Sequence, residues 1–178
     1  AVMDELGLAE KKYIVFTLNR KAIIGNDDEL RALLVSMMSH TGDIPVVAPL
    51  RQLAADAVQR IVNENPLLFE NLHIVEPLDY LHFGYLTANA LGVVTDSGNV
   101  AEEATFNTVP CITLNSYTEH IETVKVGSNV LVGEDPVLLG EEMARMVDGK
   151  WKHCGIPERW DGRSAERIVQ TLLECAAK

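Results

Sequence analysis

The sequence has few cysteines, few aromatic residues and no long apolar run. Its three cysteines, Cys111, Cys154 and Cys175, are far apart and form no Cys-x-x-Cys pair. This pattern argues against a disulfide framework and favours reduced thiols in a cytoplasmic protein. Phe, Trp and Tyr make up 6% of the 178 residues. No apolar stretch reaches the length of a membrane span, so we expect no membrane partner.

Basic residues are also scarce. Against 15 Lys and Arg there are 26 Asp and Glu, which gives a net charge of −11. Such a charge repels the phosphates of nucleic acids, so we expect no nucleic-acid partner. The net charge does not exclude a small anionic ligand, because a few hydrogen-bond donors at one site can outweigh the electrostatic repulsion from the whole protein. The five histidines show no metal-ligand spacing among themselves or with the cysteines, so no metal site is expected.

Strand-like and helix-like patterns alternate along the whole chain. The expected strands are residues 13–18, 45–48, 72–75, 91–95, 111–114 and 130–132. The expected helices are a segment capped by Asn26, residues 53–62, residues 80–88, a helix after Ser97, residues 136–147 and residues 164–177. The alternation predicts a single α/β domain over residues 1–178. Its core would be a doubly wound parallel sheet of about six strands with helices on both faces.

Helical spacing predicts which side chains face the core. One buried side of residues 53–62 is expected to hold Leu53, Ala54, Ala57, Val58 and Ile61. The final helix, residues 164–177, is expected to pack back across the domain. Its inward face would carry Ile168, Val169, Leu172 and Leu173.

The most informative stretch is residues 93–103, VVTDSGNVAEE. It predicts an apolar strand, a tight turn at Ser97 and Gly98, and a helix that opens with two carboxylates. Ligands of parallel sheets bind at the carboxyl ends of strands. A helix that starts there presents unpaired N–H groups and a positive dipole end, which suits a phosphate or diphosphate. The glutamates one turn further in could accept hydrogen bonds from sugar hydroxyls.

Each part of this stretch also has a purely structural interpretation. Ser and Gly are common in strand-to-helix connections, and Glu102 and Glu103 could simply complement the helix dipole. The stretch lacks the full Gly-x-Gly-x-x-Gly pattern of dinucleotide sites and the glycine that a hydrolase nucleophile elbow places two residues before its serine. Adjacent helical residues point about 100° apart, so only one of the two glutamates can face a ligand.

Two further loops follow strands at the same expected edge of the sheet. Arg20, after the first strand, could bind a phosphate with its forked guanidinium, or could be a solvated surface arginine. His120, after the fifth strand, lies beside Glu119 and Glu122. It could carry a proton, or could be an ordinary surface histidine.

Several segments match a known family in their order and spacing. They are LDYLHF at 78–83, TDSGN at 95–99 with EEA at 102–104, Pro110, TEHIE at 118–122, LVG at 131–133 and WDGRSAERI at 160–168. Over nearly the whole chain they resemble the carboxyl-terminal half of the non-hydrolysing UDP-N-acetylglucosamine 2-epimerases. The resemblance implies a Rossmann-like domain that is one half of a glycosyltransferase-B-like two-domain fold, with a UDP-sugar bound between the halves.

The resemblance implies roles for individual residues. The turn at Ser97 and Gly98, with Asn99 where the family has a second glycine, would hold the diphosphate through backbone donors. Glu103 would bind ribose hydroxyls, and Phe83 would lie near the uracil. No cofactor and no metal are required.

The first loop departs from the family pattern Thr-x-His-Arg-x-Glu-Asn. Asn19 stands in place of the histidine, and Ala22 and Ile23 stand in place of Glu-Asn. Asparagine cannot carry a proton near neutral pH, so the catalytic role that the resemblance implies for this position is altered. Arg20 is retained and would sit near the phosphates or the reacting sugar.

Two other positions depart as well. His120 replaces an arginine of the family motif Thr-Glu-Arg-Pro-Glu, which removes a permanent cation from an expected ligand-binding position. Arg51 stands where the family places another histidine, at the nucleotide effector site of some members.

The implied reaction interconverts UDP-N-acetylglucosamine and UDP-N-acetylmannosamine by elimination and re-addition of UDP. The acidic residues for proton transfer would lie largely in a missing amino-terminal domain, so this domain alone is expected to be inactive. Since the sequence starts at Ala1-Val2-Met3, shortly before the first expected strand, an excised domain is favoured over a natural half-protein. The family is often dimeric, which makes a homodimer one expected form.

Two other hypotheses are kept open. One is a divergent nucleotide-sugar-binding or regulatory domain that has lost the chemistry. The other is a donor-binding or acceptor-binding domain of a glycosyltransferase of the same fold class.

Overall fold

Six parallel strands form one sheet in the order β3-β2-β1-β4-β5-β6. The computed structural model describes residues 2–177. Its strands are β1 (Ile14–Phe16), β2 (Val46–Pro49), β3 (Leu72–Val75), β4 (Gly92–Thr95), β5 (Cys111–Thr113) and β6 (Asn129–Leu131). The strand order reverses between β1 and β4, where a doubly wound sheet leaves a crevice for a ligand. The predicted fold class is therefore confirmed.

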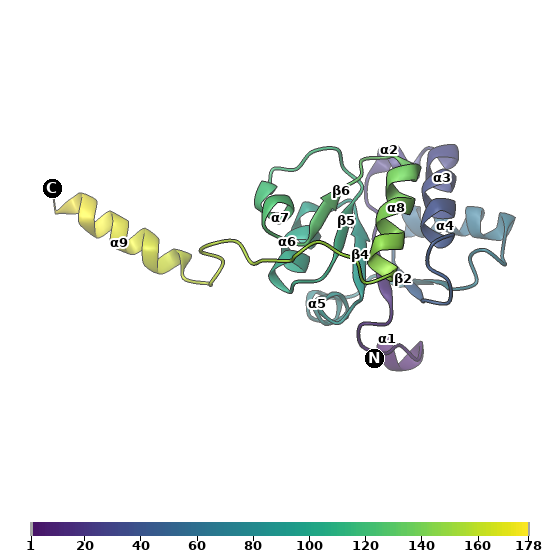
Figure 1. Ribbon diagram of the computed structural model, residues 1–178, viewed down its shortest axis with the longest axis horizontal. Coiled ribbons are helices and arrows are strands. Elements are labelled where there is room, and N and C mark those ends of the chain that lie inside the picture. Colours follow the sequence, from purple (N-terminus) through teal and green to yellow (C-terminus); the bar gives the residue numbers. More distant parts are fainter. Residues whose placement is uncertain (1, 178) are drawn as a thin grey trace.

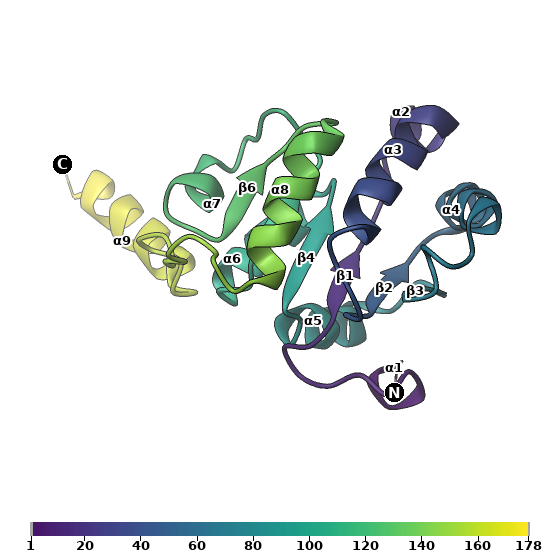
Figure 2. The ribbon, with the colours of Figure 1, turned by 45° about the vertical axis from the view of Figure 1, so that its right-hand side comes forward.

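Helices cover both faces of the sheet (Figure 1). They are α1 (Val2–Glu5), α2 (Lys21–Ile24), α3 (Asp27–Met38), α4 (Gln52–Glu64), α5 (Tyr80–Ala88), α6 (Gly98–Phe106), α7 (Ile121–Lys125), α8 (Pro136–Val147) and α9 (Ser164–Ala176). The short helices α1, α2 and α7 were not predicted, because so few residues show too little of the helical period. Helices α3, α4 and α8 lie on one face, and α5 and α6 on the other (Figure 2).

Successive residues of each central strand pack into two separate cores. Ile14 and Phe16 contact the side that carries α3, α4 and α8, whereas Tyr13 and Val15 contact the side that carries α5 and α6. Both alternating sets are apolar because helices cover both faces, which is typical of a parallel sheet. Cys111 lies in the second core, where burial raises the pKa of its thiol to about 12. It therefore acts as a small apolar side chain.

Local caps set the starts of two long helices. The Asn26 side chain accepts a hydrogen bond from the Glu29 amide at 3.2 Å, and α3 follows. Asp135 accepts from the amides of Val137 and Leu138, with Pro136 in the first turn of α8. Both arrangements satisfy helix donors that would otherwise lack partners.

One residue of α4 that the helical spacing predicted to be buried is exposed in the structure. The buried face of α4 consists of Ala54, Ala57, Val58 and Ile61. Leu53 is instead 69% exposed. This corrects the expectation: Leu53 is the second residue of α4 and lies outside its buried face.

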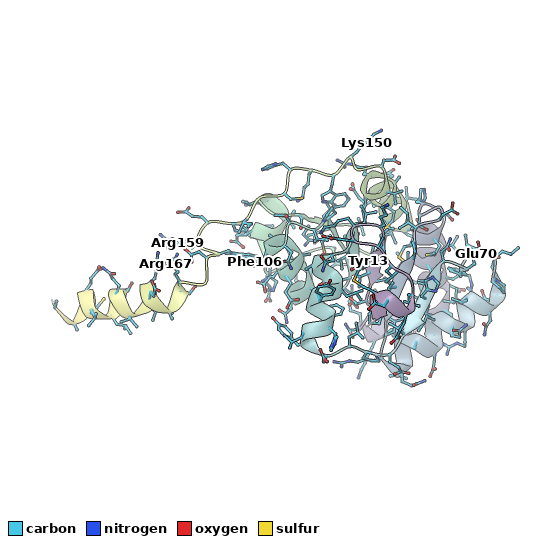
Figure 3. All side chains as sticks on the ribbon, turned by 90° about the horizontal axis from the view of Figure 1, so that it is seen from below. Tyr13, Glu70, Phe106, Lys150, Arg159 and Arg167 are labelled. Atoms are coloured by element: carbon cyan, nitrogen blue, oxygen red, sulfur yellow. The ribbon has the colours of Figure 1, made fainter. Side chains whose placement is uncertain are left out.

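Helix α9 extends away from the sheet at the end of the irregular segment 148–163 (Figure 1). Figure 3 shows Tyr13 inside the domain and Arg167 on α9, well outside it. The apolar residues of α9 are all more than half exposed: Ile168 59%, Val169 56%, Leu172 63% and Leu173 67%. This corrects the expectation that residues 164–177 pack back across the domain. A helical period shows that a helix has an apolar face, but not which surface covers that face.

Two leucine substitutions test this arrangement. Leu139 of α8 is 1% exposed and Leu172 of α9 is 63% exposed. Leu139→Ala is expected to lower the free energy of unfolding of this chain by about 2–5 kcal/mol, because it opens a cavity in the core. Leu172→Ala is expected to change it by less than about 0.5 kcal/mol. Urea unfolding measures both, and equal losses would show that α9 packs on the domain in solution.

Candidate functional site

The turn between β4 and α6 lies at the point where the strand order reverses. The Ser97 side chain caps α6 and accepts from the Val100 amide at 3.5 Å, while the Ser97 amide donates to Oγ1 of Thr95 at 3.0 Å. The helix therefore points its amino end at the crevice between β1 and β4. The first amides of a helix have no carbonyl partner within it, so this end attracts an anion.

The carboxylate of Asp96 ties two loops together. Its Oδ2 accepts from the amides of Asn19 at 2.8 Å and Arg20 at 2.6 Å, and Asp96 is only 8% exposed. The Asn115 side chain donates to the Asp96 carbonyl at 3.1 Å and adds a third loop. The three loops after β1, β4 and β5 are thus held at one edge, as the sequence predicted. The sequence did not predict these hydrogen bonds of Asp96, because no spacing along the chain reveals them.

Arg20 is held by groups from two other loops. Its Nη1 donates to the Leu114 carbonyl at 3.0 Å and to Oδ1 of Asn115 at 3.2 Å, and its Nη2 lies 2.8 Å from Oε1 of Glu134. A hydrogen bond with Glu134 also raises the pKa of the Glu29 carboxyl. Arg20 is therefore a positioned cation, although its side chain is still 41% exposed.

His120 lies across the amino end of α6. Its Nδ1 is 2.6 Å from Oε1 of Glu102. A methyl group added to Gly98 would come within 2.8 Å of Cδ2 of His120 and 3.1 Å of its Nε2, so the edge of the imidazole rests against Gly98. The structure thus brings His120 together with the turn that the sequence singled out.

Buried hydrogen bonds fix the backbone of His120. Oγ1 of Thr113 donates to the Asn129 side chain at 2.5 Å, which donates to Oγ1 of Thr123 at 3.1 Å. Thr123 in turn donates to the His120 carbonyl at 2.7 Å, and the His120 amide donates to Thr118 at 3.0 Å. This chain of bonds runs from the sheet to the loop and holds the imidazole in place.

The two glutamates of α6 divide their roles. Glu102 faces His120. Glu103 is partly buried, and this burial raises the pKa of its carboxyl, with a smaller contribution from the nearby charge of Glu102. The first turn of α6 holds no acidic residue, which corrects the expectation that the helix opens with two carboxylates. The helix dipole is therefore a weaker explanation for the presence of Glu102 and Glu103, since its effect on charged side chains fades beyond the first turn.

Two open spaces adjoin α6. A cavity of about 350 Å³, here called the loop cavity, is lined by Arg20, Gly98, Asn115, Ser116, Tyr117, Thr118, Glu119 and His120. A groove of about 550 Å³ between α5 and α6, here called the α5–α6 groove, is lined by Tyr80, Leu81, Gly84, Glu102, Glu103, Phe106, Asn107 and Trp160. Both volumes fall in the range of small-molecule sites. The loop cavity is lined by Arg20, His120 and a helix end, and the groove is lined by aromatic rings and carboxylates.

Other predicted site residues lie in varied surroundings. Asn19 and Asn99 are exposed, and Phe83 packs against the second core and does not line the α5–α6 groove. Arg51 is exposed at the start of α4. The roles of Phe83 near uracil and of Asn99 near the diphosphate stay predictions.

Residues 2–177 contain no group of three His, Cys, Asp or Glu side chains arranged to hold a metal ion. Within the same residues, no helix has the length and apolar character that crossing a membrane requires.

Sequence comparison places the chain among sugar-nucleotide epimerases. The family model for UDP-N-acetylglucosamine 2-epimerase matches residues 1–173. A UDP-N-acetylglucosamine 2-epimerase of Methanocaldococcus jannaschii is 35% identical over 168 residues, covering 90% of this chain and 44% of that protein. A UDP-2,3-diacetamido-2,3-dideoxy-D-glucuronate 2-epimerase of Pseudomonas aeruginosa is 34% identical over 175 residues, covering 95% of this chain and 47% of that protein. The chain spans about half the length of these relatives.

Solved structures give the same result. The structure of UDP-GlcNAc 2-epimerase from Methanocaldococcus jannaschii matches with a TM-score of 0.76 and 31% identity, over 97% of this chain and 48% of that chain. A structure of that enzyme in complex with UDP-GlcNAc and UDP matches with a TM-score of 0.71 and 32% identity, over 91% of this chain and 45% of that chain. Because the family model covers nearly all residues, this chain belongs to the UDP-N-acetylglucosamine 2-epimerase family.

Proposed function

We propose that this chain is the UDP-binding half of a UDP-N-acetylglucosamine 2-epimerase. The observation that carries the proposal is the loop cavity, in which the amino end of α6, Arg20 and His120 gather at the switch point of the sheet. An acidic protein of net charge −11 concentrates positive groups there, which suits an anionic ligand. The relative from Methanocaldococcus jannaschii whose structure contains UDP-GlcNAc and UDP supports the choice of nucleotide.

The proposed ligand lies across α6. Its diphosphate binds in the loop cavity, against the backbone donors of Gly98 and Asn99 and the guanidinium of Arg20. Its ribose hydroxyls donate to Glu103, which lines the α5–α6 groove. The uracil lies near Phe83. Support for this placement comes from Ser97, whose cap aims the amides of α6 at the crevice.

The proposed chemistry is elimination of UDP, followed by re-addition after C2 is protonated on the opposite face. Fixed donors around the leaving diphosphate stabilise the charge that develops as the bond between C1 and oxygen breaks. Asn19 lies beside this cavity and cannot carry a proton. We therefore assign most of the proton transfer at C2 to groups of an amino-terminal domain, and we expect the chain alone to be inactive.

The rest of the protein also covers α9 in this proposal. The chain spans about half of its relatives, and the apolar face of α9 is uncovered within the described residues. An amphipathic helix gains stability by burying such a face. We assign α9 to a contact with an amino-terminal domain, with a second copy of the chain as the other candidate. The free thiols of Cys111, Cys154 and Cys175 favour a cytoplasmic location.

Asn19 favours one alternative function. A divergent binding or regulatory domain would keep the diphosphate site and lose the proton carrier of the first loop. A glycosyltransferase domain of the same fold class would also bind a nucleotide sugar. Only the epimerase incorporates deuterium from solvent at C2, which separates these functions.

Calorimetric titration of this chain with UDP tests the binding site. Glu103→Gln is expected to weaken UDP binding about tenfold or more, because a hydrogen bond to a charged group is lost. The matched control is Glu70→Gln, since Glu70 is exposed and lies at the opposite end of the domain from Phe106 of the groove (Figure 3). No heat at millimolar UDP would refute the site, and equal losses in both variants would refute the role of Glu103.

Substitution at position 19 in the full-length protein tests the chemistry. Asn19→His is expected to raise deuterium uptake at C2 by about 100-fold or more, because it returns a proton carrier to the first loop. Asn19→Gln, which cannot carry a proton, is expected to give no increase. Mass spectrometry of the nucleotide sugar in heavy water measures the rate. A wild-type rate that Asn19→His leaves unchanged would contradict the role assigned to this position.

A further inference from the structure

The two sides of the His120 imidazole face different surroundings. On one side, Nδ1 lies 2.6 Å from Oε1 of Glu102, on the second turn of α6. On the other side, the edge formed by Cδ2 and Nε2 rests against Gly98. Nδ1 is therefore engaged by the carboxylate, while Nε2 is left at the loop cavity, which His120 and Gly98 line together with Arg20.

This arrangement decides what His120 offers to a ligand. Only a protonated nitrogen approaches a carboxylate so closely, so the hydrogen of the neutral ring resides on Nδ1. In that state Nε2 presents a lone pair, which repels a phosphate oxygen. When the ring takes a second proton, Nε2 becomes a donor and the ring becomes a cation. Histidine is the side chain that changes between these states from about pH 5 to 8.

We propose that Glu102 positions His120 so that its Nε2–H contacts the diphosphate of a bound nucleotide sugar, and that binding takes up a proton. The proposal rests on the proposed function, since it requires a diphosphate in the loop cavity. Glu102 is a positioning residue that acts through His120, whereas Glu103 contacts the ligand itself. Affinity for the nucleotide sugar then falls as the pH rises, because Nε2 loses its proton.

Other charged groups surround the same cavity. Arg20, Glu119 and Tyr117 line it with His120, and the Asp96 carboxylate lies behind the turn. Arginine keeps its charge at every relevant pH. Glu134 pairs with Arg20 and hydrogen-bonds Glu29, raising the pKa of the Glu29 carboxyl, so this acidic pair can also respond to pH. The test must therefore separate His120 from this pair.

The experiment titrates this chain with UDP-N-acetylglucosamine between pH 5.5 and 8.5. Neither phosphate of this ligand is terminal, so the ligand keeps its charge over that range. Wild-type affinity is expected to fall about tenfold, the effect of losing a charge-assisted hydrogen bond. His120→Arg stays cationic and is expected to bind with nearly constant affinity. His120→Gln is expected to bind weakly at every pH. This variant keeps Glu29 and Glu134, so any pH dependence that it still shows comes from groups other than His120.

Two further readouts distinguish positioning from plain structural support. Titrations near pH 7 in buffers of different ionisation enthalpy should show proton uptake by the wild type and none by His120→Arg. Glu102→Gln should weaken binding at pH 5.5, because the imidazole loses the carboxylate that orients its Nε2 toward the ligand. Glu103→Gln should weaken binding but keep a fall in affinity between pH 5.5 and 8.5. Urea unfolding of each variant shows that a loss of affinity is not a loss of fold.

Three results would overturn the inference. An equal pH dependence in the wild type and His120→Gln would assign the effect to other groups, such as Glu29 and Glu134. Tight wild-type binding that does not vary with pH would refute the inference and leave the proposed function intact. Absence of binding at pH 5.5 with millimolar ligand, in the wild type and in His120→Arg, would refute the proposed function and the inference together.

Discussion

The site depends on one buried carboxylate. Asp96 follows β4, and its Oδ2 accepts hydrogen bonds from the backbone amides of Asn19 and Arg20, which follow β1. These two strands are neighbours only because the strand order reverses between them. A buried carboxylate requires such donors, and the loops gain a fixed geometry in return. The positions of Arg20 and of the cap of α6 both follow from this tie, so the loop cavity does as well.

Each basic side chain of the loop cavity is paired with a carboxylate. Arg20 is paired with Glu134 and His120 with Glu102, each at less than 3 Å. The carboxylates offset positive charge, but they hold the guanidinium and the imidazole in place at the cavity that the amino end of α6 also lines. Backbone amides supply the remaining attraction for an anion without adding charge. Orientation, more than total charge, therefore makes this edge of the sheet suitable for a diphosphate.

The sheet is buried on both faces, whereas the apolar face of one helix, α9, is exposed. Both faces of the sheet are covered, and Tyr13, Ile14 and Val15 are fully buried between the layers. By contrast, α9 presents a row of exposed apolar residues, and no described residue of the chain covers it. The family relatives are about twice as long as this chain. Membership in their family and the open face of α9 both support the proposal that this domain works together with a second one.

The sequence by itself determined the strands, the longer helices and their order. Periodicity marked the six strands and most of the buried face of α4, Asn26 marked the start of α3, and the motif at Ser97 marked the ligand edge. These signals act over a few neighbouring residues, where propensity and capping decide. The contacts that build the site join residues far apart, such as Asn19 and Asp96 at a separation of 77. Only the tertiary structure could pair Glu102 with His120, bind Arg20 to Glu134 and turn α9 outward, because strand order and loop paths place those groups.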